Sequence, residues 1–446
     1  MNAETETRGT LVLAEDIIET VRPTREVPPN SFPVMPESTD PVKPLGYYEF
    51  FAGAGLVRLA LEPTWKCLWA NDIDPMKAEV YAANFGGAEL QVGDVSQVAA
   101  ATLPAGAHMA WASFPCQDLS LAGWRRGMSA ERSGSFWAFW RLMRDLHQEG
   151  RRPPLVVIEN VVGLLHGADF AGFCEALAAI DLQFGALVVD ARRFVPQSRP
   201  RVFVVGVDAR ANCSTFTTTL PKGSPWFPGA CFRAWNTLSG PARGLWRWWR
   251  LPSPTDPLPS AESLIEEHPE GVRWHTKEET DRLLSLMSTA NLEKVCGAGD
   301  SGRREVGFLY RRTRGTEQRA EVRFDGVAGC LRTPRGGSSR QTVLIVQGLQ
   351  IRSRLLSPRE AARLMGAPDS FILPSSYNDA YKAMGDGVAV PAVRWLADHL
   401  LTPLVQGPVA DLREHDPAGG RLTLQSVRSR AVAEELAARW EARAAG

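Results

Sequence analysis

The chain has 446 residues, with 50 Lys and Arg against 50 Asp and Glu, so its formal net charge is zero. Its composition, 44% apolar and 22% charged, is that of a globular protein long enough to fold as two domains. The charge balance excludes a global basic field, and the absence of a long apolar run or a signal-like N-terminus argues against a membrane or secreted protein. We therefore expect a cytoplasmic protein in which any nucleic-acid binding depends on a local basic patch.

The seven cysteines are odd in number, widely scattered and never spaced as a CxxC pair. This pattern argues against a disulfide framework and against a structural zinc site, so we expect neither disulfides nor a bound metal. It is typical of a protein that works in a reducing compartment.

The first 44 residues are polar and rich in proline, and we expect them to form a largely irregular arm. From residue 45 to about residue 208, short apolar runs alternate with helical patterns, which is typical of βαβ units on a parallel sheet. Strands are predicted in GYYEFF, KCLWAND, HMAWAS, PLVVIEN, ALVVDA and RVFVVGV, and helices in LVRLALE and PMKAEVYAANF.

The pattern changes after residue 208, where tryptophan, proline and glycine are frequent and no clean period is present. Between Arg303 and Arg340 there are ten arginines and four acidic residues, a local excess of six positive charges. Helical periodicity returns at Ser357, and an amphipathic helix is predicted within residues 407–446. We therefore expect an α/β domain that is interrupted by a smaller, irregular and basic domain and then resumed.

Three signals at successive strand ends favour a nucleoside cofactor. Gly53 and Gly55 lie in a turn between a predicted strand and helix, where the backbone can approach a ligand closely. Asp72 ends the next strand, where doubly wound folds hold ribose hydroxyls, and Asp94 ends another. A tight turn without a ligand and solvated loop acids would explain each signal alone. Together they lie at the edge where open α/β sheets bind ligands.

Cys116 follows the next strand and lies at the same predicted edge. A lone cysteine is more often a small buried hydrophobe, but Pro115 before it and the polar residues after it make a poor core environment. Glu159 ends a later strand at this edge, and Arg199 and Arg201 alternate on one face of an extended segment. A thiol, a carboxyl and two guanidiniums are therefore predicted to converge, and the cations would raise the ionised fraction of the thiol.

Eight motifs, taken in their order along the chain, resemble those of the bacterial-type DNA (cytosine-5)-methyltransferases. The resemblance covers about residues 45–208 and 345–406, and in that family a variable target-recognition segment separates the two parts. It implies a Rossmann-like class I methyltransferase domain whose doubly wound sheet is mostly parallel. The motifs are FAGAG, NDID, GDV, PCQDLS, ENVVG, QSRPR, RLLSPREAARLMGAP and GDGVAVPAV.

The resemblance also implies a division of the chain into domains. A catalytic and cofactor-binding domain would be interrupted by the target-recognition domain and completed by the closing motifs. The expected boundaries are 1–44 for the arm, 45–208 for the catalytic domain, 209–345 for target recognition, 346–406 for the return to the catalytic domain, and 407–446 for the tail.

The implied methyl donor is S-adenosylmethionine, the product is S-adenosylhomocysteine, and the acceptor is a cytosine flipped out of double-stranded DNA. Cys116 would add to carbon 6 of the cytosine, which makes carbon 5 nucleophilic. Glu159 would hydrogen-bond ring nitrogen 3 and favour its protonation. Arg201 would hold the 2-oxo group, and Arg199 would brace the thiol and the nearby loop.

The resemblance also assigns residues to the cofactor. Asp72 takes the place of a glutamate that usually binds the ribose hydroxyls, and Ile73 would pack on the adenine. The closing motif, usually Gly-Asn-Ser-Val, is Gly-Asp-Gly-Val at residues 385–388, so Asp386 would either contact the cofactor or only shape the loop. The full set is Phe51, Gly53, Ala54, Gly55, Asp72, Ile73, Asp94, Val95, Pro115, Asp386 and Val388.

DNA contacts are expected from the segment after Cys116 and from the glycine-bearing loop that ends the middle domain, because arginines and small polar residues suit phosphate and base contacts. The tryptophans at 246, 248 and 249 are expected to form a small core rather than a platform for base stacking. The expected DNA-binding residues are Gln117, Ser120, Arg335, Ser338, Ser339 and Arg340.

Two rival functions make different demands on the sequence. A tRNA cytosine methyltransferase of the same fold would have little recognition domain, whereas a long segment separates the motifs here. A non-catalytic relative would be expected to have lost the thiol, the carboxyl or the glycine turn, and all three are present. We therefore predict a monomeric DNA-modifying enzyme, associated with the nucleoid through its substrate, that either acts alone or has a cognate restriction endonuclease as its partner.

Overall fold

The computed structural model describes residues 43–115, 134–166, 169–219, 221, 223–314, 316–332 and 340–407. Residues from 44 onward divide from residues 1–43 as a compact unit of their own. The predicted N-terminal arm and the predicted C-terminal amphipathic helix lie outside the described residues.

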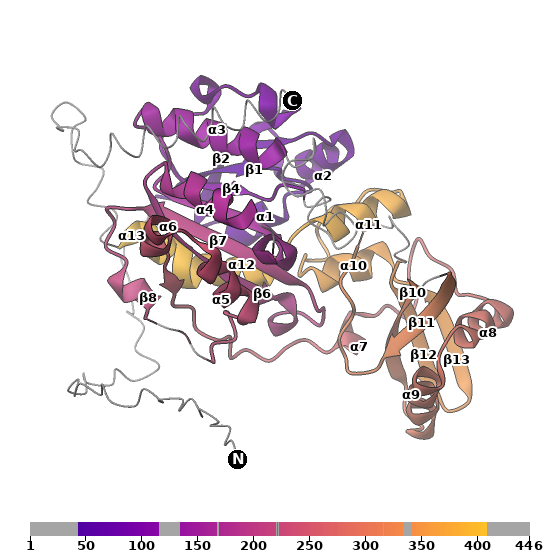
Figure 1. Ribbon diagram of the computed structural model, residues 1–446. Helices are drawn as coiled ribbons and strands as arrows, with labels where there is room; N and C mark the ends of the chain where they lie inside the picture. Colours follow the sequence, from indigo (N-terminus) through magenta and orange to yellow (C-terminus); the bar gives the residue numbers. More distant parts are fainter. Residues whose placement is uncertain are drawn as a thin grey trace, which may run out of the picture. The chain divides into compact units, whose positions relative to one another are not determined.

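A seven-stranded sheet forms the main body of the protein (Figure 1). The five strands β3, β2, β1, β4 and β5 are parallel to one another, and β7 is antiparallel to its two neighbours β5 and β6, so that β6 at the edge runs in the same direction as the first five. The predicted α/β fold with a mostly parallel, doubly wound sheet is therefore confirmed. In sheet order the strands are β3 (Leu90–Val92), β2 (Trp65–Asp72), β1 (Leu45–Phe50), β4 (Ala107–Ala112), β5 (Leu155–Val161), β7 (Pro200–Asp208) and β6 (Leu182–Asp190).

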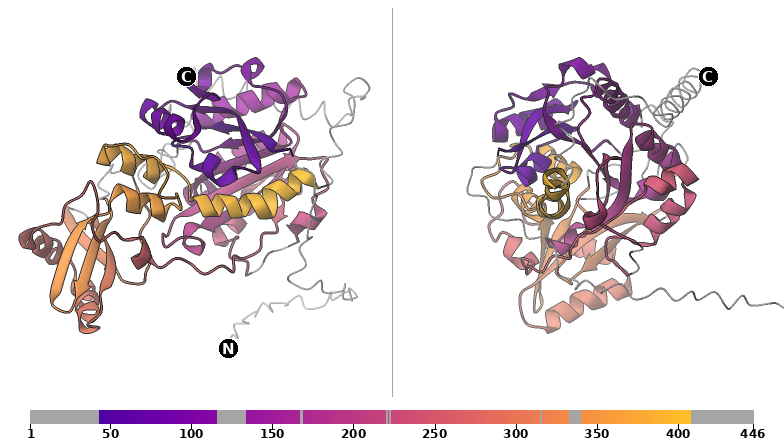
Figure 2. Two further views of the ribbon diagram at one scale, coloured as in Figure 1. Left: turned by 180° about the vertical axis from the view of Figure 1, so that it is seen from behind. Right: turned by 90° about the vertical axis from the view of Figure 1, so that its left-hand side faces the viewer.

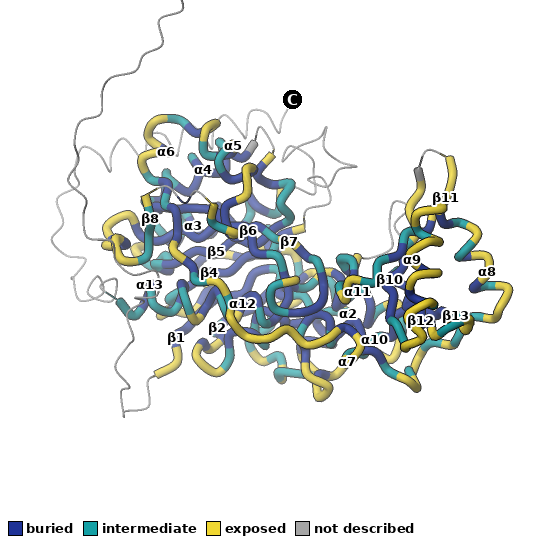
Figure 3. The backbone as a smooth tube through the Cα atoms, turned by 90° about the horizontal axis from the view of Figure 1, so that it is seen from below, coloured by how far each residue is buried: buried dark blue, intermediate teal, exposed yellow. Residues whose placement is uncertain are grey.

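The strands coincide with continuous apolar runs in the sequence. A strand that is covered on both faces of its sheet needs apolar side chains on both sides. Every residue of β1 is buried, and Figure 3 shows the central strands in the colour of buried chain. Helices lie between successive strands of the sheet, and the first two fall where the sequence predicts helices. These helices are α1 (Leu56–Leu61), α2 (Pro75–Phe85), α3 (Gly134–Gln148) and α4 (Asp169–Ala178).

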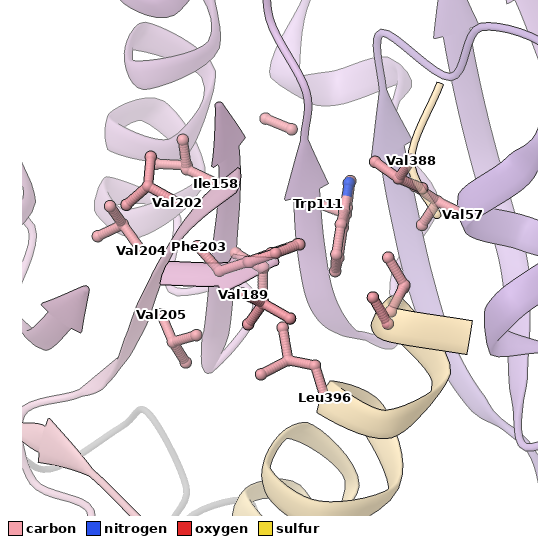
Figure 4. Packing of buried hydrophobic residues seen from close by; sticks show 14 of the residues in the cluster. Val57, Trp111, Ile158, Val189, Val202, Phe203, Val204, Val205, Val388 and Leu396 are labelled. Atoms are coloured by element: carbon pink, nitrogen blue, oxygen red, sulfur yellow. The ribbon is translucent and has the colours of Figure 1, made fainter. Parts of the chain in front are cut away.

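The last described helices return to the main sheet. Figure 2 shows α12 (Val390–Leu396) and α13 (Thr402–Gln406) running beside its strands. Figure 4 shows Leu396 of α12 near Val189 and Trp111 in the buried cluster. The two ends of the described chain therefore share one hydrophobic core.

The tryptophan-rich segment packs against the main sheet. The indole of Trp249 is fully buried, and its Nε1 donates to the carbonyls of Gly185 and Val205 at 3.2 Å each. Gly185 must be glycine here, because a Cβ at that position would lie 1.8 Å from the carbonyl oxygen of Arg247. The tryptophans are core residues, as predicted, in the cluster that surrounds the main sheet. The segment contains β8 (Thr217–Thr218), α5 (Gly229–Thr237), α6 (Gly240–Leu245) and β9 (Trp248–Trp249).

The expectation of an irregular middle region is wrong, because an ordered four-stranded antiparallel sheet lies there (Figure 1). Its strand order is β11 (Glu317–Arg323), β10 (Glu305–Arg314), β12 (Thr342–Gln347) and β13 (Gln350–Leu355). Helices α8 (Lys277–Ser285) and α9 (Thr289–Asp300) pack on this sheet and share a second apolar cluster with it. Exposed arginines interrupt the apolar pattern of β10 and β11, so periodicity alone did not reveal these strands.

Three further α-helices belong to the described chain. They are α7 (Ala261–Leu264), α10 (Pro358–Leu364) and α11 (Tyr377–Asp386). Helix α10 begins at a capping box, in which Ser357 and Glu360 each accept a hydrogen bond from the other's backbone N–H. The Glu360 carboxylate also forms a fully buried ion pair with Arg354 of β13, which fixes α10 to the antiparallel sheet.

Candidate active site

A cavity of about 390 Å³ lies where the strand order of the main sheet reverses, at the carboxyl ends of β1 and β4. Open α/β sheets bind ligands in this crevice. Five segments that the sequence separates widely form most of its walls, and side chains of α1, α2, β7 and α11 and the Arg199 side chain complete them. The five segments are residues 51–54, 72–74, 113–115, 159–161 and 385–388.

The turn after β1 shapes one wall of the cavity. Phe51 has a φ of 60°, which is uncommon for a residue with a side chain, and Gly53 has a φ of 59°. A Cβ built on Gly53 would meet no atom within 4 Å, so the protein leaves open space beside this backbone. Phe51, Gly53 and Ala54 line the cavity, whereas Gly55 caps α1 and packs against Phe85.

Asp72 and Ile73 form the neighbouring wall. The Asp72 carboxylate is buried and accepts one hydrogen bond per oxygen, from the Gly53 and Asp74 backbone N–H groups at 2.8 Å. A carboxylate has about four acceptor sites, so Asp72 retains capacity for hydroxyl donors. Ile73 is 66% exposed, which is unusual for a large apolar side chain, and it faces the cavity.

Besides Gly55, two more of the predicted cofactor residues, Asp94 and Val95, do not line the cavity. Asp94 caps a short 3-10 turn, with its Oδ1 accepting from the backbone N–H of Ser96 at 2.8 Å. Val95 is buried in the core. Both residues do follow the end of a strand, as the sequence predicts. That strand, β3, is only three residues long and lies at the edge of the sheet, whereas the cavity lies at the ends of β1 and β4.

Glu159 and Arg201 meet at the cavity, as the sequence predicts. They come from the neighbouring antiparallel strands β5 and β7, on which Val161 pairs with Arg201. The Arg201 Nε lies 3.2 Å from Glu159 Oε1, and both side chains are mostly buried while lining the cavity. A ligand in the cavity can therefore accept hydrogen bonds from the Arg201 guanidinium and donate a hydrogen bond to the Glu159 carboxylate.

Arg199 ties three segments together. Its guanidinium is buried and donates to the Leu331 carbonyl at 2.9 Å and to the carbonyls of Gly385 and Gly387 at 2.7 and 2.6 Å. Burial lowers the pKa of Arg199, and the nearby Arg201 lowers it further. The sequence pointed to this arginine but could not show that its main partners are backbone carbonyls of two distant loops.

Cys330 is a second thiol that the sequence analysis did not single out. Its Sγ accepts from the Arg199 guanidinium at 3.3 Å. Burial raises the pKa of the thiol, but Arg199 and Arg201 outweigh burial, so that the pKa of Cys330 is lowered.

Several predicted residues lie outside the described chain, namely Cys116, Gln117, Ser120, Arg335, Ser338 and Ser339. Ser113, Phe114 and Pro115, which directly precede Cys116, line the cavity. The Asn160 amide donates to the Phe114 carbonyl at 3.2 Å and so joins this segment to the end of β5. Arg340 is described, and its guanidinium contacts Asn378 and lies 5.2 Å from the ring centre of Tyr377.

Two ion pairs join α2 to α11 at the cavity. Lys77 Nζ lies 2.9 Å from Asp386 Oδ2, and Lys382 Nζ pairs with Asp74. All four residues line the cavity. Residues some 300 positions apart form each pair, so the sequence, which marked Asp386 as a candidate cofactor residue, did not reveal its partner Lys77 or the second pair.

Disulfides, clusters of metal ligands and membrane-spanning helices are features that the described chain does not show. Its six cysteines are free thiols, and no group of three or more His, Cys, Asp and Glu residues within it is arranged to hold a metal ion. Among its helices, none is long and apolar enough to cross a membrane.

The sequence and fold match known proteins. Residues 45–402 match the family described as C-5 cytosine-specific DNA methylase. The type II methyltransferase M.HhaI of Haemophilus parahaemolyticus is 27% identical over 362 residues, covering 79% of this chain and 93% of the relative. M.BsuFI of Bacillus subtilis is 25% identical over 358 residues, covering 79% of this chain and 71% of the relative.

Solved structures share the fold at low identity. The S. pombe Dnmt2 methyltransferase has a TM-score of 0.51 and 17% identity, covering 81% of this chain and 98% of that chain. The Entamoeba histolytica methyltransferase EhMeth has a TM-score of 0.53 and 14% identity, covering 83% of this chain and 100% of that chain. At these identities the likeness supports the fold alone.

Proposed function

Because the chain belongs to the C-5 cytosine-specific DNA methylase family, a family of DNA (cytosine-5-)-methyltransferases, we propose that it methylates carbon 5 of a cytosine. The methyl donor is S-adenosylmethionine, and the cytosine lies within a specific sequence of double-stranded DNA. The observation that carries this proposal is the Glu159–Arg201 pair in the wall of a cavity at the topological switch point. The segment that leads to Cys116 lines the same cavity.

The residues at the cavity fit S-adenosylmethionine, which when bound supplies an electrophilic methyl group on a sulfonium. Gly53 leaves open space beside its backbone, as a closely held ligand requires. Asp72 has acceptor capacity for ribose hydroxyls, and the exposed Ile73 offers an apolar surface to an adenine ring. Phe51, Ala54, Pro115 and Val388 complete the cavity wall.

On the acceptor side, we assign the covalent step to Cys116. Its thiolate would add to carbon 6 of the cytosine and form a carbon–sulfur bond, while ring nitrogen 3 takes a proton. Glu159 would hydrogen-bond nitrogen 3 and favour that protonation, and Arg201, held by Glu159, would bind the 2-oxo group. After methylation, loss of the carbon 5 proton to a base and expulsion of the thiolate would restore the aromatic ring.

The target cytosine must leave the duplex, because a stacked base cannot meet a thiol within the helix, and extrusion costs a few kcal/mol. We assign recognition of the target sequence to the middle domain with its antiparallel sheet. Several of its arginines are already paired within the protein, among them Arg304 with Glu262 and Arg323 with Asp325. These ion pairs lower the basic charge that this region offers to DNA phosphates.

Sequencing of methylated cytosines in plasmid DNA from cells that express the chain tests the proposal. We expect 5-methylcytosine in one short sequence context, and none in cells that express a Cys116→Ala variant. Methylation of RNA alone, or of another base or ring position, would contradict the proposal. The relatives are type II methyltransferases, which supports a role as the modification enzyme of a restriction–modification pair. A protective effect against digestion at the same sequence would test that role.

A further inference from the structure

The Lys77–Asp386 ion pair lies in the cavity wall and has no role in the function proposed so far. Lys77 is in the first turn of α2, and Asp386 is the last residue of α11. The side chain of Lys77 is 16% exposed and that of Asp386 is 36% exposed, so the lysine is the more deeply placed partner. Both line the cavity beside Asp72.

The backbone around Asp386 is held firmly in place. The Arg199 guanidinium donates to the carbonyls of Gly385 and Gly387, the two neighbours of Asp386 in the chain. A Cβ on Gly387 would lie 2.5 Å from the Leu56 side chain, so glycine allows this loop to approach α1. The Asp386 carboxylate, at the position where the family motif usually has asparagine, is therefore presented to the cavity by a fixed loop.

Lys77 remains a cation in this setting. Burial acts to lower the pKa of the lysine, but the carboxylates of Asp386, Asp72 and Asp74 outweigh burial and raise it. An ammonium has three donor hydrogens, and the pair with Asp386 uses one of them. A cation and an anion thus stand 2.9 Å apart on one wall of the cavity.

We infer that the Lys77–Asp386 pair recognises the α-amino-acid end of the cofactor, with Lys77 binding its carboxylate and Asp386 its ammonium. The inference rests on the proposed function, because it takes S-adenosylmethionine as the ligand of the cavity. An α-amino acid carries an ammonium and a carboxylate on one carbon, so a lysine and an aspartate held side by side can each bind the group of opposite charge. The asparagine that the family motif usually has in place of Asp386 is neutral and would offer the ammonium no full negative charge. Lys77 is then a cofactor-binding residue of this chain, and Asp386 contributes more than the shape of the loop.

Calorimetric titration with three ligands tests this inference without any turnover. S-adenosylhomocysteine carries both charges, its decarboxylated analogue carries only the ammonium, and 5′-methylthioadenosine carries neither. Lys77→Met should weaken binding of S-adenosylhomocysteine about tenfold or more, as expected for loss of one charge-assisted hydrogen bond. It should leave the affinity for the other two ligands unchanged. Asp386→Asn should weaken both ligands that carry the ammonium, and spare 5′-methylthioadenosine.

Two further variants keep the test decisive. Lys77→Arg retains the cation and should keep most of the affinity for S-adenosylhomocysteine, even if Lys77→Met folds poorly. Lys277→Met removes a lysine from the exposed Lys277–Asp281 pair on α8 and should change no affinity. Equal losses for all three ligands in Lys77→Met, or no loss for any, would overturn the inference. If the wild-type protein binds no S-adenosylhomocysteine at all, the proposed function itself fails, which is a distinct result.

Discussion

Replacing Glu49 with glutamine should remove a strong dependence of stability on pH. Glu49 lies in β1, one strand position before the turn that shapes the cavity, and its side chain is fully buried. Its Oε2 accepts a hydrogen bond from the Tyr47 hydroxyl at 3.3 Å, and its Oε1 has no hydrogen-bond partner among the described residues. Burial raises the pKa of Glu49 from 4.5 to about 8, although Tyr47 and Arg58 oppose this shift.

The sign and size of the effect follow from proton linkage. Between pH 4.5 and about 8 the folded protein keeps the proton of Glu49 while the unfolded chain has lost it. Stability is therefore lost as the pH rises through this window, at about 1.4 kcal/mol per pH unit. From about pH 5.5 to 7.5 the loss is about 3 kcal/mol, and above about pH 8 it levels off. Glutamine keeps an acceptor for Tyr47 and has no proton to lose.

Urea unfolding followed by tryptophan fluorescence at several pH values would measure this difference. The free energy of unfolding of Glu49→Gln, minus that of the wild type, should increase by about 3 kcal/mol from about pH 5.5 to 7.5. Glu79→Gln, at an exposed position on α2, is the matched control and should run parallel to the wild type. A constant difference between Glu49→Gln and the wild type across pH would refute the argument, because Glu49 would then ionise as it does in the unfolded chain.

Two further substitutions separate function from packing. Glu159→Gln should lower the rate of methylation by about 10²- to 10⁴-fold, because a proton-transfer partner is lost. Thermal unfolding and DNA binding should change little, and a methylation rate near that of the wild type would show that Glu159 takes no part in the chemistry. Gly185→Ala should cost about 1–3 kcal/mol of unfolding free energy, because its Cβ would meet the Arg247 carbonyl. Gly172→Ala, whose Cβ would meet nothing within 4 Å, should cost nothing, and equal effects of the two alanines would contradict the packing argument.

The sequence revealed the parts of the site that depend on topology. Four residues lie at or near the carboxyl ends of four different strands, and these strand ends meet at one edge of a doubly wound sheet. They are Phe51, Asp72, Pro115 and Glu159. Apolar runs mark the strands of such a sheet clearly, because both faces are covered. Order along the chain was therefore enough to predict which of these residues meet.

The parts that the sequence did not reveal depend on contacts between distant segments. Lys77 pairs with Asp386, and Arg199 holds the loop around it, through contacts that no local pattern encodes. The strands β10 and β11 carry arginines on their exposed positions, so their alternation of apolar and polar residues is weak. Propensity and periodicity describe local structure, and these features are tertiary.

Covalent trapping on DNA tests the central claim, that Cys116 attacks a cytosine at this cavity. A duplex with 5-fluorocytosine at the target position should hold the protein, because fluorine cannot leave as a proton does, and the adduct should survive denaturation. We predict an adduct that depends on S-adenosylmethionine, maps to the peptide with Cys116 and is absent from the Cys116→Ala variant. An adduct at another cysteine, such as Cys330, or an active enzyme that forms no adduct, would contradict the mechanism.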